Sequence, residues 1–300
     1  FLYNNASYYT NLGTLAYTNS VTYTVTLGVN TPVASSLVPY LINNPVTGEK
    51  YLINTGGDML VYSAGASGLT LQATVNIADN IVYAAVNTNS GEVYLATTAG
   101  IYTMTGAAPY TTAGPYAAGI ADYALDTGSV NGMNRLMTFY PGDGTPGSER
   151  LYTVFQDTGA FGGLNYMAVE WLVGAPYTAT PFYTLTAPLG GTGVVANVMY
   201  CETFNKIMFN IGSTSSVITL IDPTDNTIVY TSPATAYSNI TWPIEDKTNG
   251  AVIYYSYAAS PTTNLFYYIL DTANISECTQ NIVDLVIGSS GPYEYNSTTQ

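Results

Sequence analysis

The chain has 300 residues, with 19 acidic side chains, five basic side chains and no histidine, which gives a formal net charge of −14 at pH 7. A protein that binds nucleic acid needs a basic surface to neutralise phosphates, and serine or cysteine nucleophiles activated by histidine need that residue, so the composition argues against both classes. Hydrophobic residues make up 47% of the chain, which is enough to bury a substantial core.

Charged residues make up only 8% of the chain, and its polarity comes instead from Thr, Ser, Asn and 29 Tyr. Acid unfolds proteins largely by protonating carboxylates that the native state holds charged. A surface solvated by hydroxyls and amides changes little as the pH falls, and without histidine nothing titrates near pH 6.5. We therefore expect an exposed, acidic habitat. A Thr-, Asn- and Tyr-rich secreted β-protein at neutral pH is the alternative.

The first thirty residues, which include "ASYYTNLGTLAYTNSVTYTVTLGV", alternate Thr with apolar residues and predict strands. We expect these strands to close the last sheet of a ring, beside "NIVDLVIG" and "PYEYN" near the C-terminus, or to be donated to a neighbouring molecule. Residues 1–290 are then one domain, and 291–300 are a Ser/Thr-rich tail.

Short strand-like runs repeat along the rest of the chain, and helical periodicity is nearly absent. Each run has a polar start, an aromatic-aliphatic strand and a turn, and another apolar run precedes it. The five runs start at Glu49 ("EKYLINTGGDMLVYSAG"), Gly91 ("GEVYLATTAGIYTMTG"), Ser148 ("SERLYTVFQDTGAFGGLNYMAVEWLVG"), Asn205 ("NKIMFNIGSTSSVITLIDPTDNTIVYTSP") and Asn264 ("NLFYYILDT"). A spacing of about 40–60 residues is typical of propeller blades. We predict an all-β, single-domain β-propeller of four-stranded antiparallel blades, six in number, with five or seven as alternatives.

The stretch 206–233 contains "KIMFNI", "GSTSS", "VITLID", "PTDN" and "TIVYTSP". In this order of strands and turns it resembles the YVTN-type β-propeller repeat of archaeal surface-layer and other exported proteins. Residues 49–75 and 91–106 follow a similar rhythm. The resemblance implies a propeller blade and a surface location.

The turn "DPTDN" in this stretch concentrates charge in a chain that has little of it. Asp222 and Asp225 are predicted to form the turn by bonding nearby backbone N–H groups, with Pro223 fixing φ and Asn226 adopting a left-handed conformation. A calcium site is the alternative, although it needs six to eight oxygen ligands.

Several features predict export. The chain begins at Phe1 without Met, as a mature protein after signal removal does, and no apolar run is long enough for a transmembrane helix. Two cysteines, Cys201 and Cys278, favour one disulfide, with two buried thiols as the alternative. Four N-glycosylation triplets predict glycans, at Asn5, Asn239, Asn274 and Asn296.

Paired carboxylates are the one catalytic option with a residue basis, because propellers host glycosidases that use two Asp or Glu residues. The candidates on or near predicted strands are Asp122, Asp126, Glu170 and Glu202. No spacing singles out a pair, and no cofactor or metal motif is present, so a structural role is the preferred interpretation for each. We therefore expect a non-enzymatic structural or adhesion protein of a cell surface, filament or virion that contacts itself, other surface proteins or glycans. A secreted carbohydrate-active enzyme is the alternative.

Overall fold

The computed structural model describes the fold over most of the chain. The described residues are 14–16, 22–24, 41–53, 57–65, 68–97, 99–119, 123–125, 136–157, 165–174, 177–186, 195–212, 216–231, 240–246, 251–256, 264–270 and 275–278. They form antiparallel strands, and the helical element among them is one 3₁₀ turn, η2 (Glu202–Phe204). The all-β prediction is confirmed for these residues. None of the helical structure described here has the length or apolar character to cross a bilayer.

The chain divides into two compact units, one of residues 4–117 and one of residues 118–300 together with 1–3. The first unit begins with a hairpin of β1 (Thr14–Ala16) and β2 (Thr22–Thr24). Two four-stranded sheets follow: β3 (Leu41–Asn43), β4 (Lys50–Ile53), β5 (Met59–Gly65) and β6 (Gly68–Val75), then β7 (Ile81–Val86), β8 (Val93–Thr97), β9 (Gly100–Met104) and β10 (Thr112–Tyr116).

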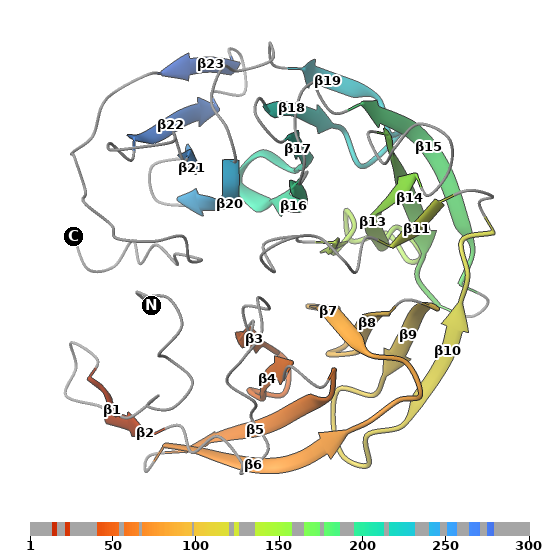
Figure 1. The fold of residues 1–300 in the computed structure, drawn as a ribbon, viewed down its shortest axis with the longest axis vertical. Coiled ribbons are helices and arrows are strands. Elements are labelled where there is room, and N and C mark those ends of the chain that lie inside the picture. The colour runs from red at the N-terminus through yellow and green to blue at the C-terminus, as the bar shows by residue number, and fades with distance from the viewer. Residues whose placement is uncertain are drawn as a thin grey trace. The chain divides into compact units, whose positions relative to one another are not determined.

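The described residues of the second unit form three sheets, whose strands are labelled in Figure 1 except for β12. They are β11 (Tyr123–Leu125), β12 (Met137–Tyr140), β13 (Arg150–Asp157), β14 (Asn165–Leu172) and β15 (Ala179–Thr186); β16 (Val195–Cys201), β17 (Lys206–Gly212), β18 (Ser216–Ile221) and β19 (Ile228–Thr231); and β20 (Ile240–Asp246), β21 (Ala251–Ser256), β22 (Asn264–Leu270) and β23 (Ile275–Cys278).

In the four-stranded sheets the strands lie side by side in chain order, each antiparallel to the next. The first strands of successive sheets adjoin within each unit: β3 lies against β7, β12 against β16, and β16 against β20. This is the arrangement of successive propeller blades.

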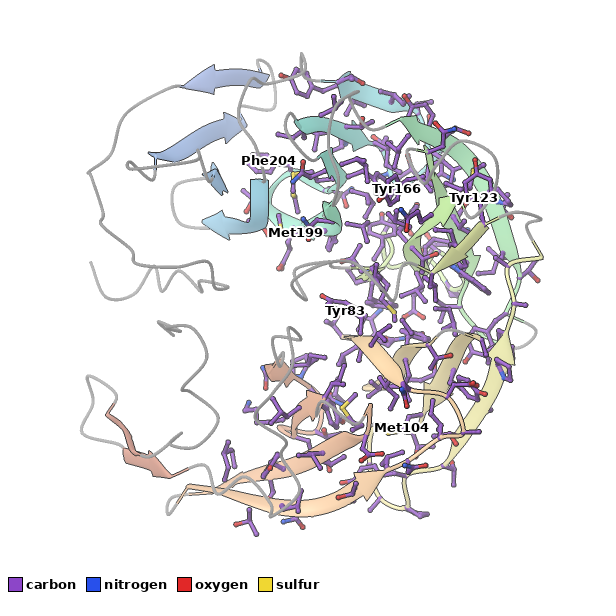
Figure 2. All side chains as sticks on the ribbon, viewed as in Figure 1. Tyr83, Met104, Tyr123, Tyr166, Met199 and Phe204 are labelled. Carbon is purple, nitrogen blue, oxygen red and sulfur yellow. The ribbon has the colours of Figure 1, made fainter. Side chains whose placement is uncertain are left out.

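Clusters of buried side chains lie between neighbouring sheets within each unit, and Figure 2 draws all the described side chains on the ribbon. All five residues of β8 are buried, so both faces of this strand are covered. One cluster joins β13 and β14 to β16–β18 and contains Tyr166 and Phe209. A second joins the two sheets of the 4–117 unit and contains Met104. The fourth strands β10 and β19 are mostly exposed, and among the described residues no further strand pairs with them on the outer side.

The repeat prediction is confirmed for most described strands and corrected in two places. In the last sheet, the run that starts at Asn264 forms the third strand, β22, whereas the other four runs begin at the second strand position of their sheets. In the third sheet, β11 and β12 both pair with β13, so two short segments share the position of one strand. The described residues contain five sheets of four or five strands. Residues 279–300, which the closure of a sixth blade requires, lie outside them.

The N-terminal strands β1 and β2 pair with each other, and β2 lies against β6. Cys201 is buried on β16, the first strand of its sheet, whereas Cys278 is on β23, the fourth strand of the next sheet. A disulfide between them needs Cα atoms about 4.4–6.8 Å apart. The side chain of Cys278 lies outside the described residues, and the disulfide stays a prediction. The asparagines of the four glycosylation triplets also lie outside the described residues, so the glycans stay a prediction.

Candidate functional site

Of the four candidate catalytic carboxylates, two lie among the described residues. Glu170 is on β14, and its side chain is 16% exposed. Glu202 is exposed at the start of η2, directly after β16. Asp122 and Asp126 lie outside the described residues.

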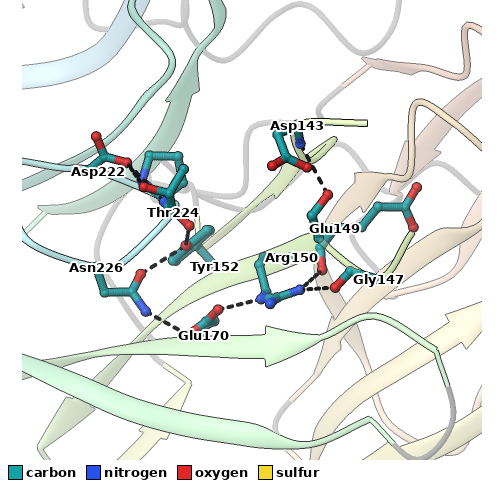
Figure 3. A network of polar contacts seen from close by, with 11 residues as sticks. Asp143, Gly147, Glu149, Arg150, Tyr152, Glu170, Asp222, Thr224 and Asn226 are labelled. Carbon is teal, nitrogen blue, oxygen red and sulfur yellow. Dashed lines mark hydrogen bonds and ion pairs between the residues drawn. The ribbon is translucent and has the colours of Figure 1, made fainter. Parts of the chain in front are cut away.

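Both carboxylate oxygens of Glu170 are occupied by donors from the protein. Arg150 on β13 donates from Nε to Oε1 at 2.5 Å, and Asn226 donates from Nδ2 to Oε2 at 2.6 Å. Arg150 is itself fixed by its Nη1 contacts to the carbonyl oxygens of Gly147 and Glu149. Because Asn226 belongs to the turn between β18 and β19, Glu170 joins two neighbouring sheets (Figure 3).

Tyr152 adds a second contact between the same two sheets. Its side chain is fully buried on β13, and its hydroxyl lies 2.9 Å from Oδ1 of Asn226 and 3.2 Å from the carbonyl oxygen of Pro223. Burial, followed by the nearby charge of Glu170, raises the pKa of Tyr152. We call Arg150, Tyr152, Glu170 and Asn226 the inter-sheet clamp.

The "DPTDN" turn has the predicted local structure. Oδ1 of Asp222 accepts the backbone N–H of Thr224 at 3.0 Å and its hydroxyl at 2.6 Å, and Oδ2 pairs with Nζ of Lys206 at 2.9 Å. Asp225 accepts the backbone N–H and the hydroxyl of Thr227. Asn226 has φ of 59°, in the left-handed region. The prediction that both aspartates form the turn is confirmed. Their carboxylates contact turn residues and one lysine.

Replacing Asp222 by asparagine tests this turn by its pH dependence. Burial raises the pKa of Asp222, but the contacts from Thr224 and Lys206 outweigh it and lower that pKa from 3.8 to about 2. The stabilisation that depends on this charge is therefore complete above the unfolded-state pKa and is lost as the pH falls through about 2. We expect Asp222→Asn to lower Tm by about 2 °C above about pH 5, and the difference to narrow below about pH 4.

Thermal unfolding followed by circular dichroism between neutral and acidic pH measures this difference. The matched control is Asp225→Asn, since Asp225 accepts the same kinds of donor without a lysine partner. If the Tm difference between wild type and Asp222→Asn stayed constant to the lowest pH, the role of the Asp222 charge in this turn would be contradicted.

The same turn geometry occurs twice in the 4–117 unit. Asn44 accepts the backbone N–H of Val46 through Oδ1, and Asn87 accepts that of Asn89 in the same way. The fifth residue of each turn has positive φ: Gly48 and Gly91 correspond to Asn226. The amide of this fifth residue donates to the carbonyl of the first in all three turns. The motif N-x3-G-E-x-Y, at residues 44–51 and 87–94, is the sequence signal of the two turns in this unit.

A second carboxylate contact joins the two sheets of the 4–117 unit. Oε2 of Glu49 accepts from the hydroxyl of Tyr51 at 2.8 Å, and Oε1 accepts from that of Tyr110 at 2.5 Å. Asn44 donates from Nδ2 to the hydroxyl of Tyr51 and to the carbonyl of Gly91. Burial raises the pKa of Tyr51 to about 12 with help from Glu49, although the contact from Asn44 acts in the opposite direction.

A third carboxylate contact joins the last two sheets of the 118–300 unit. Glu245 on β20 accepts the backbone N–H groups of Glu202 and Thr203 at 3.1 and 2.6 Å. These amides begin η2, so the carboxylate satisfies donors that a short helical turn leaves open. The sequence carries no local signal for the inter-sheet contacts of Glu49 and Glu245, because Tyr110, Glu202 and Thr203 lie in or beside other sheets.

These contacts determine what the described carboxylates can do chemically. A glycosidase needs one carboxyl group that can protonate the leaving group and a second that is free to act as nucleophile or base. Glu170, Glu49 and Glu245 instead accept hydrogen bonds that connect sheets. No group of three metal-ligating His, Cys, Asp or Glu side chains occurs among the described residues. Each of these three carboxylates therefore contributes to a contact between two sheets.

Neither a known protein family nor a curated protein matches the sequence. Solved structures with a similar fold include the Dos1 propeller (TM-score 0.53, 11% identity, covering 84% of this chain and 65% of that one). Another is the dihydro-heme d1 dehydrogenase NirN in complex with DHE (TM-score 0.51, 7% identity, covering 84% of this chain and 49% of that one). A third is the Kuenenia stuttgartiensis hydrazine synthase (TM-score 0.53, 11% identity, covering 83% of this chain and 68% of that one). The chain thus spans less than two thirds of the length of the Dos1 and NirN structures. At such identities the likeness shows the fold alone, which is all-β, built of antiparallel sheets and of the β-propeller kind.

Proposed function

We propose that this chain is a non-enzymatic structural or adhesion module of an extracellular surface: a cell surface, filament or virion of an acid-tolerant, archaeal system. One observation carries the proposal. In the described part of the chain, the best-placed catalytic candidate, Glu170, has both oxygens engaged by Arg150 and Asn226 across a sheet junction. A carboxylate held in this way stabilises a scaffold and is poorly placed to transfer protons.

The sequence supports the surface location independently of Glu170. The chain carries few charges, it has four glycosylation triplets, and residues 206–233 resemble the YVTN-type repeat of exported archaeal proteins. Its partners under this proposal are further copies of itself, other surface proteins or glycans. Electron microscopy of the native source tests the proposal directly, and an ordered lattice, filament or spike containing the chain is the expected result.

The alternative, a secreted carbohydrate-active enzyme, is tested with Glu170→Gln. We expect the wild-type chain to release no reducing sugar from a panel of polysaccharides, and this variant to lower the free energy of unfolding by about 1–3 kcal/mol. The reason is that glutamine presents an NH₂ group where one of the two donors, Arg150 or Asn226, now meets an oxygen. Urea unfolding measures the free energy, and a reducing-end assay measures the activity.

Glu202→Gln is the companion variant for the activity assay, since Glu202 is the other described candidate and is exposed. Sugar release that either substitution abolishes, while circular dichroism shows the fold intact, would replace the structural proposal by the enzymatic one. An unchanged free energy of unfolding in Glu170→Gln would contradict the clamp.

A further inference from the structure

The chain contains a single Asp–Pro peptide bond, Asp222–Pro223. Such bonds are the most acid-labile in ordinary polypeptides, because the aspartate carboxylate can attack its own carbonyl carbon. The proline nitrogen, part of a tertiary amide, is also readily protonated as it leaves. In this chain the bond lies inside the turn between β18 and β19.

We propose that the fold keeps Asp222–Pro223 closed to acid cleavage by holding the Asp222 carboxylate away from its own carbonyl carbon. Oδ1 is held by the N–H and hydroxyl of Thr224 at 3.0 and 2.6 Å, and Oδ2 by Nζ of Lys206 at 2.9 Å (Figure 3 shows the Thr224 side). Attack requires one oxygen to leave these donors. The same contacts reduce the nucleophilicity of both oxygens.

The backbone on both sides of the bond is equally fixed. The carbonyl of Asp222 accepts the N–H of Asn226 at 2.8 Å, and its N–H donates to the carbonyl of Thr227 at 2.8 Å. Pro223 is buried, and its carbonyl lies 3.2 Å from the hydroxyl of Tyr152 on the neighbouring sheet. Burial limits the access of acid and water to the proline nitrogen.

The charged and titratable groups around the bond come from three elements and the turn itself. Lys206 lies on β17 and contacts the carboxylate directly, and Tyr152 on β13 faces the turn. Glu170 on β14 reaches the turn through Asn226, and Asp225 lies within the turn. Lys206 is thus the cation in contact with the carboxylate, and its removal has the most direct effect.

The cleavage itself balances without any cofactor. One carboxylate oxygen of Asp222 bonds to the carbonyl carbon, the C–N bond to Pro223 breaks, and the proline nitrogen takes a proton from the acidic solvent. Water then opens the cyclic anhydride left on Asp222. The net reaction is hydrolysis, and it yields one fragment that ends at Asp222 and one that begins at Pro223.

Intact-mass spectrometry over time tests the proposal, at the lowest pH at which circular dichroism shows the chain folded. In concentrated urea at the same pH, the wild-type chain is expected to give the two fragments. Without urea, cleavage is expected to be on the order of a thousandfold slower, since it then follows the small unfolded population. Pro223→Ala in urea identifies the cleaved bond: the two fragments are expected to disappear, because the substitution removes the labile proline amide.

Two single substitutions distinguish the effect of the carboxylate contacts on the cleavage rate from the effect of overall folding stability. Thr224→Ala removes the hydroxyl donor, and Lys206→Met removes the ammonium donor. Urea unfolding gives the loss of folding free energy in each variant, and from it the increase in unfolded fraction. In both variants, cleavage without urea is expected to be faster than this increase predicts. Thr227→Ala is the matched control, since its hydroxyl contacts Asp225 instead of Asp222, and it is expected to behave as wild type.

Three results would overturn the proposal. One is folded wild-type chain that is cleaved as fast as the chain in urea. Another is Thr224→Ala and Lys206→Met chains that are cleaved no faster than their unfolded fractions predict, which would assign protection to folding alone. The third is cleavage in urea that persists unchanged in Pro223→Ala.

Discussion

Replacing Gly106 by alanine is expected to destabilise the 4–117 unit by about 3 kcal/mol. A Cβ atom at this position would lie 1.9 Å from the carbonyl oxygen of Gly91 and 2.5 Å from its carbonyl carbon. The Gly91 carbonyl cannot easily move away, because it accepts from Nδ2 of Asn44, while the Gly91 amide donates to Asn87. The substitution therefore forces two backbone segments of one unit apart.

Gly48→Ala is the matched control for this substitution. Gly48 has φ of 75°, but no atom lies within 4 Å of the place that an added Cβ would occupy, so the change strains the backbone without a clash. It is expected to cost about 1 kcal/mol, the ordinary penalty for a side chain in the left-handed region. Urea unfolding of both variants compares them. A Gly106→Ala chain as stable as Gly48→Ala would show that the Gly91 and Gly106 loops do not touch in solution.

Phe209→Ala is the second substitution with a large expected effect, a loss of about 3–5 kcal/mol in the free energy of unfolding. Phe209 on β17 is fully buried in the cluster between two sheets of the 118–300 unit. Its ring meets that of Phe182 on β15 edge-to-face, with centroids 6.2 Å apart, and Phe182 in turn meets Tyr152 at 6.0 Å. The truncation leaves a cavity whose walls belong to two sheets and cannot close independently.

A double-mutant cycle with Phe182→Ala tests whether this packing joins the sheets. The coupling between the two substitutions is expected to be about 1 kcal/mol, since rings in contact do not contribute additively. Phe209→Leu serves as the conservative control and is expected to lose about 1.5 kcal/mol at most. Strict additivity of the two alanine substitutions would contradict the packing of β15 against β17.

The sequence predicts local structure well wherever one strand or turn contains all the atoms involved. The strands at 206–212 and 216–221 follow from their apolar runs, and the "DPTDN" turn follows from the chemistry of its own residues. Side-chain oxygens of Asp and Asn reach backbone donors two residues away, so no distant partner is needed. The assignment of strands to sheets is less secure. The run at Asn264 forms the third strand of its sheet, although the other four runs begin at the second position, and its apolar pattern does not distinguish the two positions.

What the sequence by itself determined is therefore the all-β class, the repeated rhythm of strands and the turn-forming role of Asp222 and Asp225, since these depend on spacing and local bonding. Only the tertiary structure showed the contacts of Glu170. As one residue in a strand, it was a catalytic candidate, and its two donors became apparent once β14 lay beside β13 and the turn before β19. Glu49 and Tyr110, 61 residues apart, likewise meet only because two sheets pack together. The physical reason is that a carboxylate acquires its role from the donors that surround it, and in this fold most of them come from distant parts of the chain.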